Sequence, residues 1–420
     1  MTIDKIVDKY VPRERQRRFL YLSFPAWMIV SYGVLLGAFT SKSVIEDLGM
    51  SGSLAAAFLK SSVFIGMLVG AFLSGFIADV FGRKMAMNVY LLFATLFTFL
   101  SGFTADAKLF ITMRILAGFG YGGLMPSVNT YLSETISIRI RGMYLVLLES
   151  MWAIGSILVG LVHITLGQTT WRWDYWMMGI GFALFIGFLI VPESPRFAFL
   201  KGGKKALEEV LRKEVKEEVE DLKKVKIPIS ELLKGEYMKR TLVIWLVWFS
   251  LSIIYYGIFL WLPKIFASKG LLEHSMWMTF LMMVFQLPGY LLAAYLIEKM
   301  GRVRSLSLFL FGTAAASLGF ALVSNQPLYI TMAFLTSIFC LGAWGIVYAY
   351  TPELYPTACR TTGNGAAGTV TRIGDMIAPY IIPMFKGNVI ASLVFFSILA
   401  LISGIAVAVL RFETKGSEIS

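Results

Sequence analysis

Long apolar runs separated by short charged loops are the feature that most limits what this chain can fold into. A helix needs about 20 mostly apolar residues to cross a bilayer. About twelve runs reach that length, with expected limits of 19–40, 54–80, 86–104, 108–133, 142–166, 174–191, 241–263, 275–297, 304–323, 327–350, 362–385 and 388–410. We therefore expect an all-α membrane protein with about twelve transmembrane helices.

Composition supports a lipid environment. Of the 420 residues, 57% are hydrophobic and only 15% are charged, which is too little charge to cover the surface of a soluble protein of this size. The formal net charge of +12 lies in the loops between apolar runs, as is typical of membrane proteins. The lipid bilayer is thus the expected partner, and nucleic acid is not.

Lysine and arginine indicate the orientation. They concentrate in every second loop, at Arg83, Lys84, Arg139, Arg141, Lys299, Arg302, Arg304 and Arg360. The basic N-terminal segment precedes the first apolar run, Phe19–Thr40, which is too long for a signal-peptide core and has no small-residue cleavage site after it. The positive-inside rule then predicts a multi-pass cell-membrane protein with both termini in the cytoplasm.

One long charged stretch separates the two groups of spans. Within residues 201–240, apolar side chains recur at helical spacing, at Leu207, Val210, Leu211, Val215, Val219 and Leu222. This pattern predicts an amphipathic cytoplasmic helix in a linker that rests on the membrane surface. The expected domains are an N-terminal six-helix bundle at 1–192, the linker at 193–240, and a C-terminal six-helix bundle with its tail at 241–420.

An internal repeat supports two equivalent halves. Several loop and helix residues recur exactly 219 positions later: Asp79, Gly82 and Arg83 at Glu298, Gly301 and Arg302; Tyr131, Glu134 and Arg141 at Tyr350, Glu353 and Arg360; Gly155 at Gly374. A constant offset across several elements indicates duplication of a six-span unit, which is the symmetry of two transporter halves.

The repeated loops also carry recognisable motifs. GFIADVFGRK at 75–84 has the pattern of the major facilitator superfamily loop, and AYLIEKMGRVR at 294–304 is a weaker copy with Ala294 and Glu298 in place of glycine and aspartate. PESPR at 192–196, PELYPTACRTTGNG at 352–365 and ETKG at 413–416 resemble the sugar-porter and organic-ion branch. This resemblance implies two six-helix pseudo-symmetric bundles, secondary transport by alternating access, and a monomer.

Acidic and basic residues of these loops are candidates for gating. A carboxylate near a helix end can pair with a neighbouring cation or cap a neighbouring helix. We expect pairing of Asp79 with Arg83 and, on the same face, of Glu134 with Arg141 and of Glu353 with Arg360. The alternative is that the cations only orient the chain. The gating candidates are Asp79, Arg83, Glu134, Arg141, Glu298, Arg302, Glu353 and Arg360.

Ionisable residues inside spans are costly and usually functional. Arg114 and Lys60 are expected in the outer half of the membrane, and His163 near its outer boundary. Glu149 and Arg372 are expected near the midplane, in two spans that are copies of one element. Arg372 is a candidate to contact an anionic group of the substrate, while Glu149 or Asp375 carries a proton. Alternatively, Arg372 forms an ion pair that only locks the structure.

The resemblance sharpens this hypothesis. TRIGDMIAPY, which contains Arg372, resembles the arginine-bearing form of organic anion transporters. Glu149 lies where sugar porters carry a sugar-binding glutamine, which disfavours a simple sugar site. Proton-coupled sugar porters pair a span-1 aspartate with a span-4 arginine. Here Arg114 is present, but span 1 has no acid.

Aromatic side chains are candidates to stack on a flat organic substrate. Trp152 follows Glu149 by about one helical turn, and Tyr255 and Tyr256 are adjacent in span 7. The alternative is the usual place of these rings at a membrane interface.

No phosphate loop, nucleophile–histidine pair or metal-ligand spacing occurs, so we expect no enzyme activity, cofactor or metal. The leading hypothesis is a secondary transporter for a small organic anion, coupled to protons. A sugar or polyol porter, a multidrug efflux antiporter and a non-transporting sensor of the same fold are the alternatives.

Overall fold

The computed structural model describes the chain except for residues 220–228, 356 and 415–420, and omits a few further side chains, including that of Arg360. The first part of the chain forms α1 (Ile3–Tyr10), α2 (Arg13–Asp47), α3 (Gly52–Phe81), α4 (Arg83–Ser101), α5 (Ala107–Thr135), α6 (Ile138–Val162), η1 (His163–Gly167), α7 (Arg172–Trp176), η2 (Met177–Ile180), α8 (Gly181–Ile190) and α9 (Pro195–Leu211). The second part forms α10 (Ile229–Leu232), α11 (Gly235–Phe259), α12 (Leu262–Ser268), α13 (Ser275–Val284), α14 (Gln286–Met300), α15 (Arg302–Leu322), α16 (Gln326–Glu353), α17 (Thr357–Ile377), η3 (Ala378–Tyr380), α18 (Ile381–Met384) and α19 (Val389–Leu410).

The expected all-α membrane architecture is confirmed. Among the described residues, eleven helices are long and apolar enough to cross a membrane. The remaining expected span, 362–385, is also helical, as α17, η3 and α18. Residues 362–375 are rich in glycine and threonine and include Asn364 and two charges, Arg372 and Asp375. This polar composition explains why the segment is not among the eleven apolar helices.

The chain divides into two compact units. The first comprises Met1–Leu36 and Ser62–Lys223, and the second comprises Gly37–Ser61 and Lys224–Ser420. The boundary at 223–224 lies in the expected linker. The segment 37–61, which comprises the end of α2, the loop after it and the start of α3, belongs to the second unit.

Glycine allows helices of the first unit to approach at backbone distance. A Cβ on Gly66 of α3 would lie 1.9 Å from the carbonyl oxygen of Ile115, and a Cβ on Gly118 of α5 would lie 2.0 Å from that of Val63. Small residues at helix interfaces are a common means of association in membranes. The α3–α5 pair is therefore held by close van der Waals packing.

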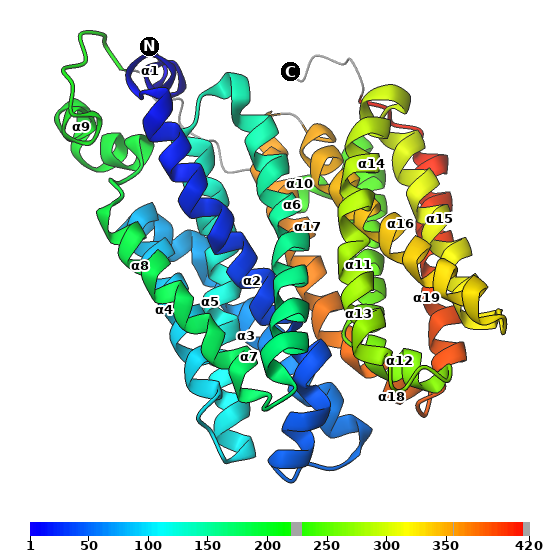
Figure 1. The fold of residues 1–420 in the computed structure, drawn as a ribbon. Coiled ribbons are helices and arrows are strands. Elements are labelled where there is room, and N and C mark those ends of the chain that lie inside the picture. Colours follow the sequence, from blue (N-terminus) through cyan, green and yellow to red (C-terminus); the bar gives the residue numbers. More distant parts are fainter. Residues whose placement is uncertain (220–228, 356, 415–420) are drawn as a thin grey trace. The chain divides into compact units, whose positions relative to one another are not determined.

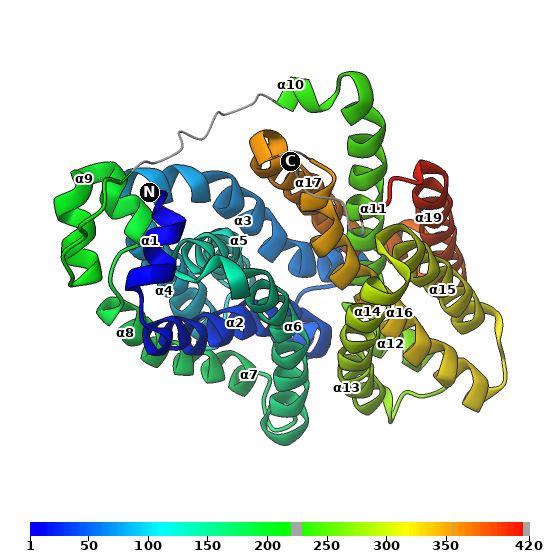
Figure 2. The same cartoon turned by 90° about the horizontal axis from the view of Figure 1, so that it is seen from above.

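In the second unit, α11 lies beside α17 and also contacts α16 (Figures 1 and 2). Gly374 of α17 permits this approach, because a Cβ there would lie 2.7 Å from Ser252 Oγ and 3.1 Å from the carbonyl oxygen of Phe249. Arg372 and Asp375 flank this glycine and so lie against α11. The fold thus brings both intramembrane charges of α17 to a contact between helices.

The linker differs from its prediction. Helix α9 ends at Leu211, and Arg212 has a left-handed backbone with φ of 56°, so the predicted helical pattern stops there. Leu222 lies outside the described residues. The apolar face is covered by α1 and forms with it the N-terminal cluster of Ile3, Ile6, Val7, Val11, Leu207, Leu211 and Val215 (Figures 1 and 2). These linker side chains therefore pack against protein, where we expected contact with the membrane surface.

Candidate functional site

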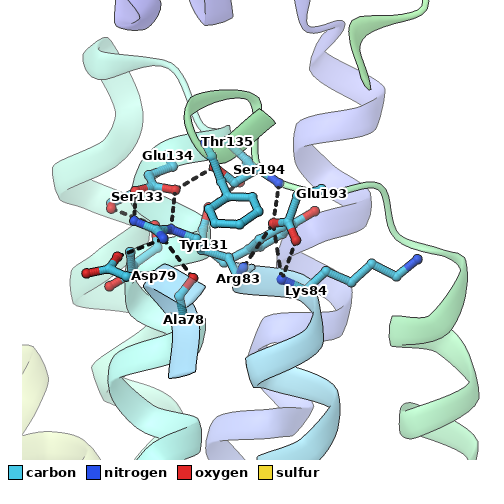
Figure 3. Close-up of polar contacts among 12 residues, drawn as sticks. Ala78, Asp79, Arg83, Lys84, Tyr131, Ser133, Glu134, Thr135, Glu193 and Ser194 are labelled. Atoms are coloured by element: carbon cyan, nitrogen blue, oxygen red, sulfur yellow. Dashed lines mark hydrogen bonds and ion pairs between the residues drawn. The ribbon is translucent and has the colours of Figure 1, made fainter. Parts of the chain in front are cut away.

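The first loop motif forms a polar cluster that we call the Arg83 network, buried except at Asp79: Asp79, Arg83, Glu134, Glu193 and Ser194 (Figure 3). Arg83 Nη1 lies 2.9 Å from Asp79 Oδ1, and its Nε donates to Glu134 Oε2 at 3.2 Å. The Arg83 and Glu134 side chains are only 10% and 6% exposed. Ser194 Oγ donates to the same Glu134 oxygen. Because buried charges need partners, each member keeps the others in place.

Glu193 completes this network by capping α4. Its carboxylate accepts hydrogen bonds from the backbone N–H groups of Arg83 at 3.1 Å and Lys84 at 3.2 Å. These are orphan donors of the first helical turn, where a negative charge also meets the positive end of the helix dipole. Gly82 is required between α3 and α4, because its φ is 102° and a Cβ would lie 2.3 Å from Glu193 Oε2.

The second unit contains a matching cluster, the Arg302 network: Glu298, Arg302, Glu353, Glu413 and Thr414. Arg302 donates Nε and Nη2 to the two oxygens of Glu353, at 2.8 and 3.0 Å, in a bidentate pair. Glu413 accepts from the backbone N–H groups of Arg302 at 2.8 Å and Val303 at 3.1 Å. Burial is incomplete, since Arg302 is 16% exposed.

The two networks agree in detail. Tyr131 donates its hydroxyl proton to the carbonyl oxygen of Pro192 at 2.8 Å, and Tyr350 does so to that of Phe412 at 2.5 Å. The acids Glu193 and Glu413, which cap the two helices, were not among the residues singled out from the sequence. Both lie in motifs that the sequence analysis quoted, PESPR and ETKG. They follow the repeated arginines by nearly equal distances, 110 and 111 positions, and this was the signal that could have identified them.

The expected ion pairs of Arg141 with Glu134 and of Arg360 with Glu353 are not seen among the described side chains. Arg141 lies 2.7 Å from Asp4 of α1, so it is not the ion-pair partner of Glu134. Glu134 is satisfied by Arg83 and Ser194 instead. The side chain of Arg360 lies outside the described residues, and Glu353 pairs with Arg302. In both units, the arginine and glutamate that pair are 51 positions apart.

Arg372 and Asp375 form an ion pair inside the second unit. Arg372 Nη1 lies 2.8 Å from Asp375 Oδ2, and these side chains are 12% and 0% exposed. The other oxygen, Asp375 Oδ1, accepts a hydrogen bond from Ser252 of α11 at 2.5 Å. The side chains of Tyr256 and Tyr348 lie within electrostatic reach of Arg372. A buried guanidinium, a carboxylate and two phenols are thus gathered where α11, α16 and α17 meet.

Tyr256 and Tyr348 belong to a set of packed aromatic rings that we call the aromatic cluster: Trp248, Tyr255, Tyr256, Trp344 and Tyr348. Trp248 and Tyr348 pack edge to face with centroids 4.6 Å apart, and Tyr255 and Tyr256 with centroids 4.9 Å apart. Tyr255 also accepts a hydrogen bond from Gln286 at 3.4 Å. The predicted candidates Tyr255 and Tyr256 are therefore buried inside the protein.

Glu149 and Trp152 lie on α6 in the first unit. Trp152 is buried, and its carbonyl oxygen accepts a hydrogen bond from Ser31 of α2 at 2.6 Å. Glu149 is half-buried. These residues are therefore placed in a different unit from Arg372 and Asp375.

Arg114 also lies in the first unit. Because span 1 contains no acidic residue, Arg114 has no carboxylate partner on that span. Its Nη2 donates to the carbonyl oxygen of Gly33 on α2 at 2.7 Å, so a backbone dipole faces the guanidinium where related porters are expected to place a carboxylate. His163 is buried, and its Nδ1 lies 2.9 Å from Asp174 Oδ2.

Lys60 belongs to the second unit and is 5% exposed. Its ammonium lies 3.3 Å from the ring centroid of Trp261, a cation–π contact that replaces part of its lost hydration. Among the described residues, no group of histidine, cysteine and acidic side chains could hold a metal ion.

Comparison with known proteins places these features in a family. Residues 27–420 match the family model described as sugar (and other) transporter. The putative niacin/nicotinamide transporter NiaP of Bacillus subtilis is 33% identical over 414 residues, covering 96% of this chain and 98% of that protein. The niacin transporter NiaP of Acinetobacter baylyi is 31% identical over 376 residues, covering 85% and 84%.

A solved structure agrees with the fold. The partially occluded inward-open xylose transporter XylE of E. coli superposes with a TM-score of 0.76 at 16% identity, over 96% of this chain and 100% of that one. With duplicated loop motifs, membrane-spanning helices and a family match over nearly its whole length, the chain belongs to the sugar (and other) transporter family of the major facilitator superfamily, whose members are membrane transporters and not enzymes.

Proposed function

We propose that this protein transports a small aromatic carboxylate of the nicotinate type together with a proton. One observation carries the proposal: the Arg372–Asp375 ion pair, with its 2.8 Å contact, is buried next to a cluster of aromatic rings. A guanidinium binds a carboxylate through paired hydrogen bonds, and flat rings bind a flat ring by stacking or edge contacts. This combination fits an aromatic anion better than a sugar, which offers many hydroxyl groups and no charge.

The names of two relatives support this substrate class, since one is described as a putative niacin/nicotinamide transporter and the other as a niacin transporter. Nicotinate is a pyridine ring with one carboxylate, so it has the charge and the flat shape that Arg372 and the aromatic cluster would select. The XylE structures are similar in fold at much lower identity, and they carry no argument for a sugar.

Asp375 offers a physical route to proton coupling. As long as Asp375 is ionised, it competes with a substrate carboxylate for Arg372. When Asp375 takes up a proton, its charge is lost and the guanidinium attracts an external carboxylate more strongly. Proton and anion would then bind together, and neither would bind well alone, because moving a single uncompensated charge into this buried place is costly. Glu149, in the other unit, remains the alternative proton carrier.

The test is binding of radiolabelled nicotinate to the purified protein at acidic and neutral pH. We expect tighter binding by the wild type at acidic pH, because protonated Asp375 no longer competes. Asp375→Asn imitates the protonated carboxyl group and should bind tightly at both pH values. The double variant Arg372→Gln/Asp375→Asn removes both charges without leaving one buried alone, and it should lose about 10- to 100-fold in affinity.

Matched measurements decide between the alternatives. Glu149→Gln should keep the pH dependence; if it removes that dependence while Asp375→Asn does not, Glu149 is the proton carrier. Full affinity of the double variant for nicotinate would exclude Arg372 from the site. Neutral sugars that compete with nicotinate equally at every pH would support the porter alternative instead.

We also propose that the Arg83 and Arg302 networks face the cytoplasm, together with both termini. The support is the concentration of lysine and arginine in alternate loops. Labelling of single cysteines with an impermeant reagent in intact cells tests this, and a cysteine at the exposed Lys5 or Lys201 positions should react only after the membrane is opened.

A further inference from the structure

Trp344 of α16 carries a polar group that the proposed function has not used. The residue is 7% exposed, and its indole Nε1 is buried without a hydrogen-bond partner among the described residues. Two other tryptophans of this unit are satisfied: Trp248 Nε1 donates to Thr351 Oγ1 at 2.9 Å, and Trp261 Nε1 donates to the carbonyl oxygen of Pro379 at 3.1 Å. A buried donor left without a partner destabilises the protein and calls for an explanation.

The position of Trp344 explains why its indole N–H has no partner. Its ring packs against Trp248 at 5.3 Å and against Tyr348 at 5.9 Å between centroids. Tyr348 in turn lies within electrostatic reach of Arg372. The unpartnered N–H is therefore part of the same cluster as the proposed carboxylate anchor, where a bound substrate would lie.

Other buried indoles also lack partners, at Trp27, Trp176 and Trp245. Trp176 is the clearest contrast, because it belongs to the first unit and packs against Phe103 and Trp173. The cation of the same helix, Arg172, donates to the carbonyl oxygens of Gly102 and Thr104. An unpartnered indole is thus not by itself a site, and the neighbourhood of Arg372 is what distinguishes Trp344.

We propose that Trp344 Nε1 donates a hydrogen bond to an acceptor atom in the ring of the substrate, so that the protein selects heteroaromatic carboxylates over carbocyclic ones of the same shape. This inference rests on the proposed function. An indole N–H only donates, so the matching group must be an acceptor such as the unprotonated nitrogen of a pyridine. A substrate held by its carboxylate at Arg372 satisfies Trp344 with a second polar atom of the same flat molecule.

The expected selectivity follows from the buried donor. A site built to hydrogen-bond its substrate rejects an analogue that lacks the group, because the polar atom of the protein is then left unpaired. For one neutral hydrogen bond, we expect nicotinate to bind about tenfold more tightly than benzoate, which has the same outline and charge but no ring nitrogen.

The experiment is competition of radiolabelled nicotinate from the purified protein by unlabelled nicotinate and by benzoate. In Trp344→Phe the ring is kept and the N–H is removed, so the preference should fall from about tenfold to near one, mainly through weaker binding of nicotinate. Trp176→Phe removes an equally buried, unpartnered N–H from the other unit, and it should keep the wild-type preference. An unchanged preference in Trp344→Phe would overturn the inference.

A second measurement uses the wild type alone and does not depend on a variant that folds. We compare nicotinate with 1-methylpyridinium-3-carboxylate, whose blocked ring nitrogen cannot accept a hydrogen bond. It should compete as weakly as benzoate or more weakly. Equal competition by all three carboxylates would reject the role of Trp344 and leave the carboxylate transporter intact. Failure of every carboxylate to bind would reject the proposed function, and this inference with it.

Discussion

Gly33 shows how a single small residue arranges the buried cation of the first unit. A Cβ at this position would lie 1.9 Å from the hydroxyl oxygen of Tyr121, so the ring of α5 occupies the space that a side chain of α2 would need. The carbonyl oxygen of Gly33 accepts from Arg114 instead. That span 1 carries no acid was predictable from the sequence. The contact of Tyr121 with Gly33 was not predictable, because it depends on packing between two helices.

Replacement of Gly33 by alanine should destabilise the protein by about 1–3 kcal/mol, the usual cost of overpacking a filled interior. Gly75 of α3 is the matched control, since a Cβ there meets nothing within 4 Å. Gly75→Ala should leave stability unchanged or raise it by up to about 1 kcal/mol through higher helix propensity. Melting of both variants in detergent checks this, and equal melting temperatures would show that Tyr121 moves aside without cost.

At the scale of helices, the caps of α4 and α15 offer a paired comparison. Glu193 and Glu413 each accept two backbone N–H groups at the start of one helix. Replacement of either by alanine should cost about 0.5–2 kcal/mol, as the loss of a helix cap does. Thermal unfolding measures both. If neither variant melts earlier than the wild type, the carboxylates do not stabilise these helices.

The N-terminal helix α1 is a second element with a measurable attachment. Glu217 accepts hydrogen bonds from Lys9 and Tyr10, and these bonds lower the pKa of Glu217 from 4.5 to about 2. Because its pKa is depressed in the folded state, the carboxylate contributes fully above pH 4.5, and its contribution is lost as the pH falls from there towards 2. The group is exposed, so salt should weaken the effect.

A spin label on α1, at the exposed position Lys5, tests this attachment. Its mobility should be constant at neutral and mildly acidic pH and should rise only once the pH falls below 4.5. In Glu217→Gln, the pH-dependent step should be smaller. Ile6→Ala weakens the N-terminal cluster at any pH, because Ile6 is fully buried. A label that is equally mobile in the wild type and in Ile6→Ala would mean that α1 is not docked.

How far the sequence predicts these elements depends on the kind of interaction. Apolar runs predicted the membrane helices, because the length and hydropathy of a run can be read locally from the sequence. The repeat of 219 residues predicted the two equivalent loops, because it compares the sequence with itself and needs no knowledge of contacts. The predicted pairing of Glu134 with Arg141 was wrong. From the sequence, Arg83 and Arg141 are equally plausible partners until the helices are placed. The linker helix is shorter than predicted. Its apolar pattern continues to Val215, but Val215 packs on α1 from a non-helical segment.

At the scale of the whole molecule, the two arginine networks repeat the same interaction in both units. Each unit joins an arginine to a glutamate 51 positions away and caps the arginine's helix with a second acid. Orientation in the membrane requires only the cations. We therefore propose that the repeated carboxylates act in the transport cycle, in which the networks stabilise one conformation relative to another.

Arg83→Gln and Arg302→Gln test this role, because each removes a charge and keeps a hydrogen-bonding side chain. If the networks stabilise one state of the cycle, each variant should slow nicotinate uptake into proteoliposomes, with a larger loss in the double variant, since transport needs both states in turn. Affinity measured in detergent should change much less, as neither arginine belongs to the aromatic cluster or its ion pair. Lys299→Gln is the control, because it removes an exposed charge at the end of α14 and outside both networks. Uptake slowed equally by all three variants would mean that loop charge alone matters, and uptake slowed by none would leave the networks with a purely structural role.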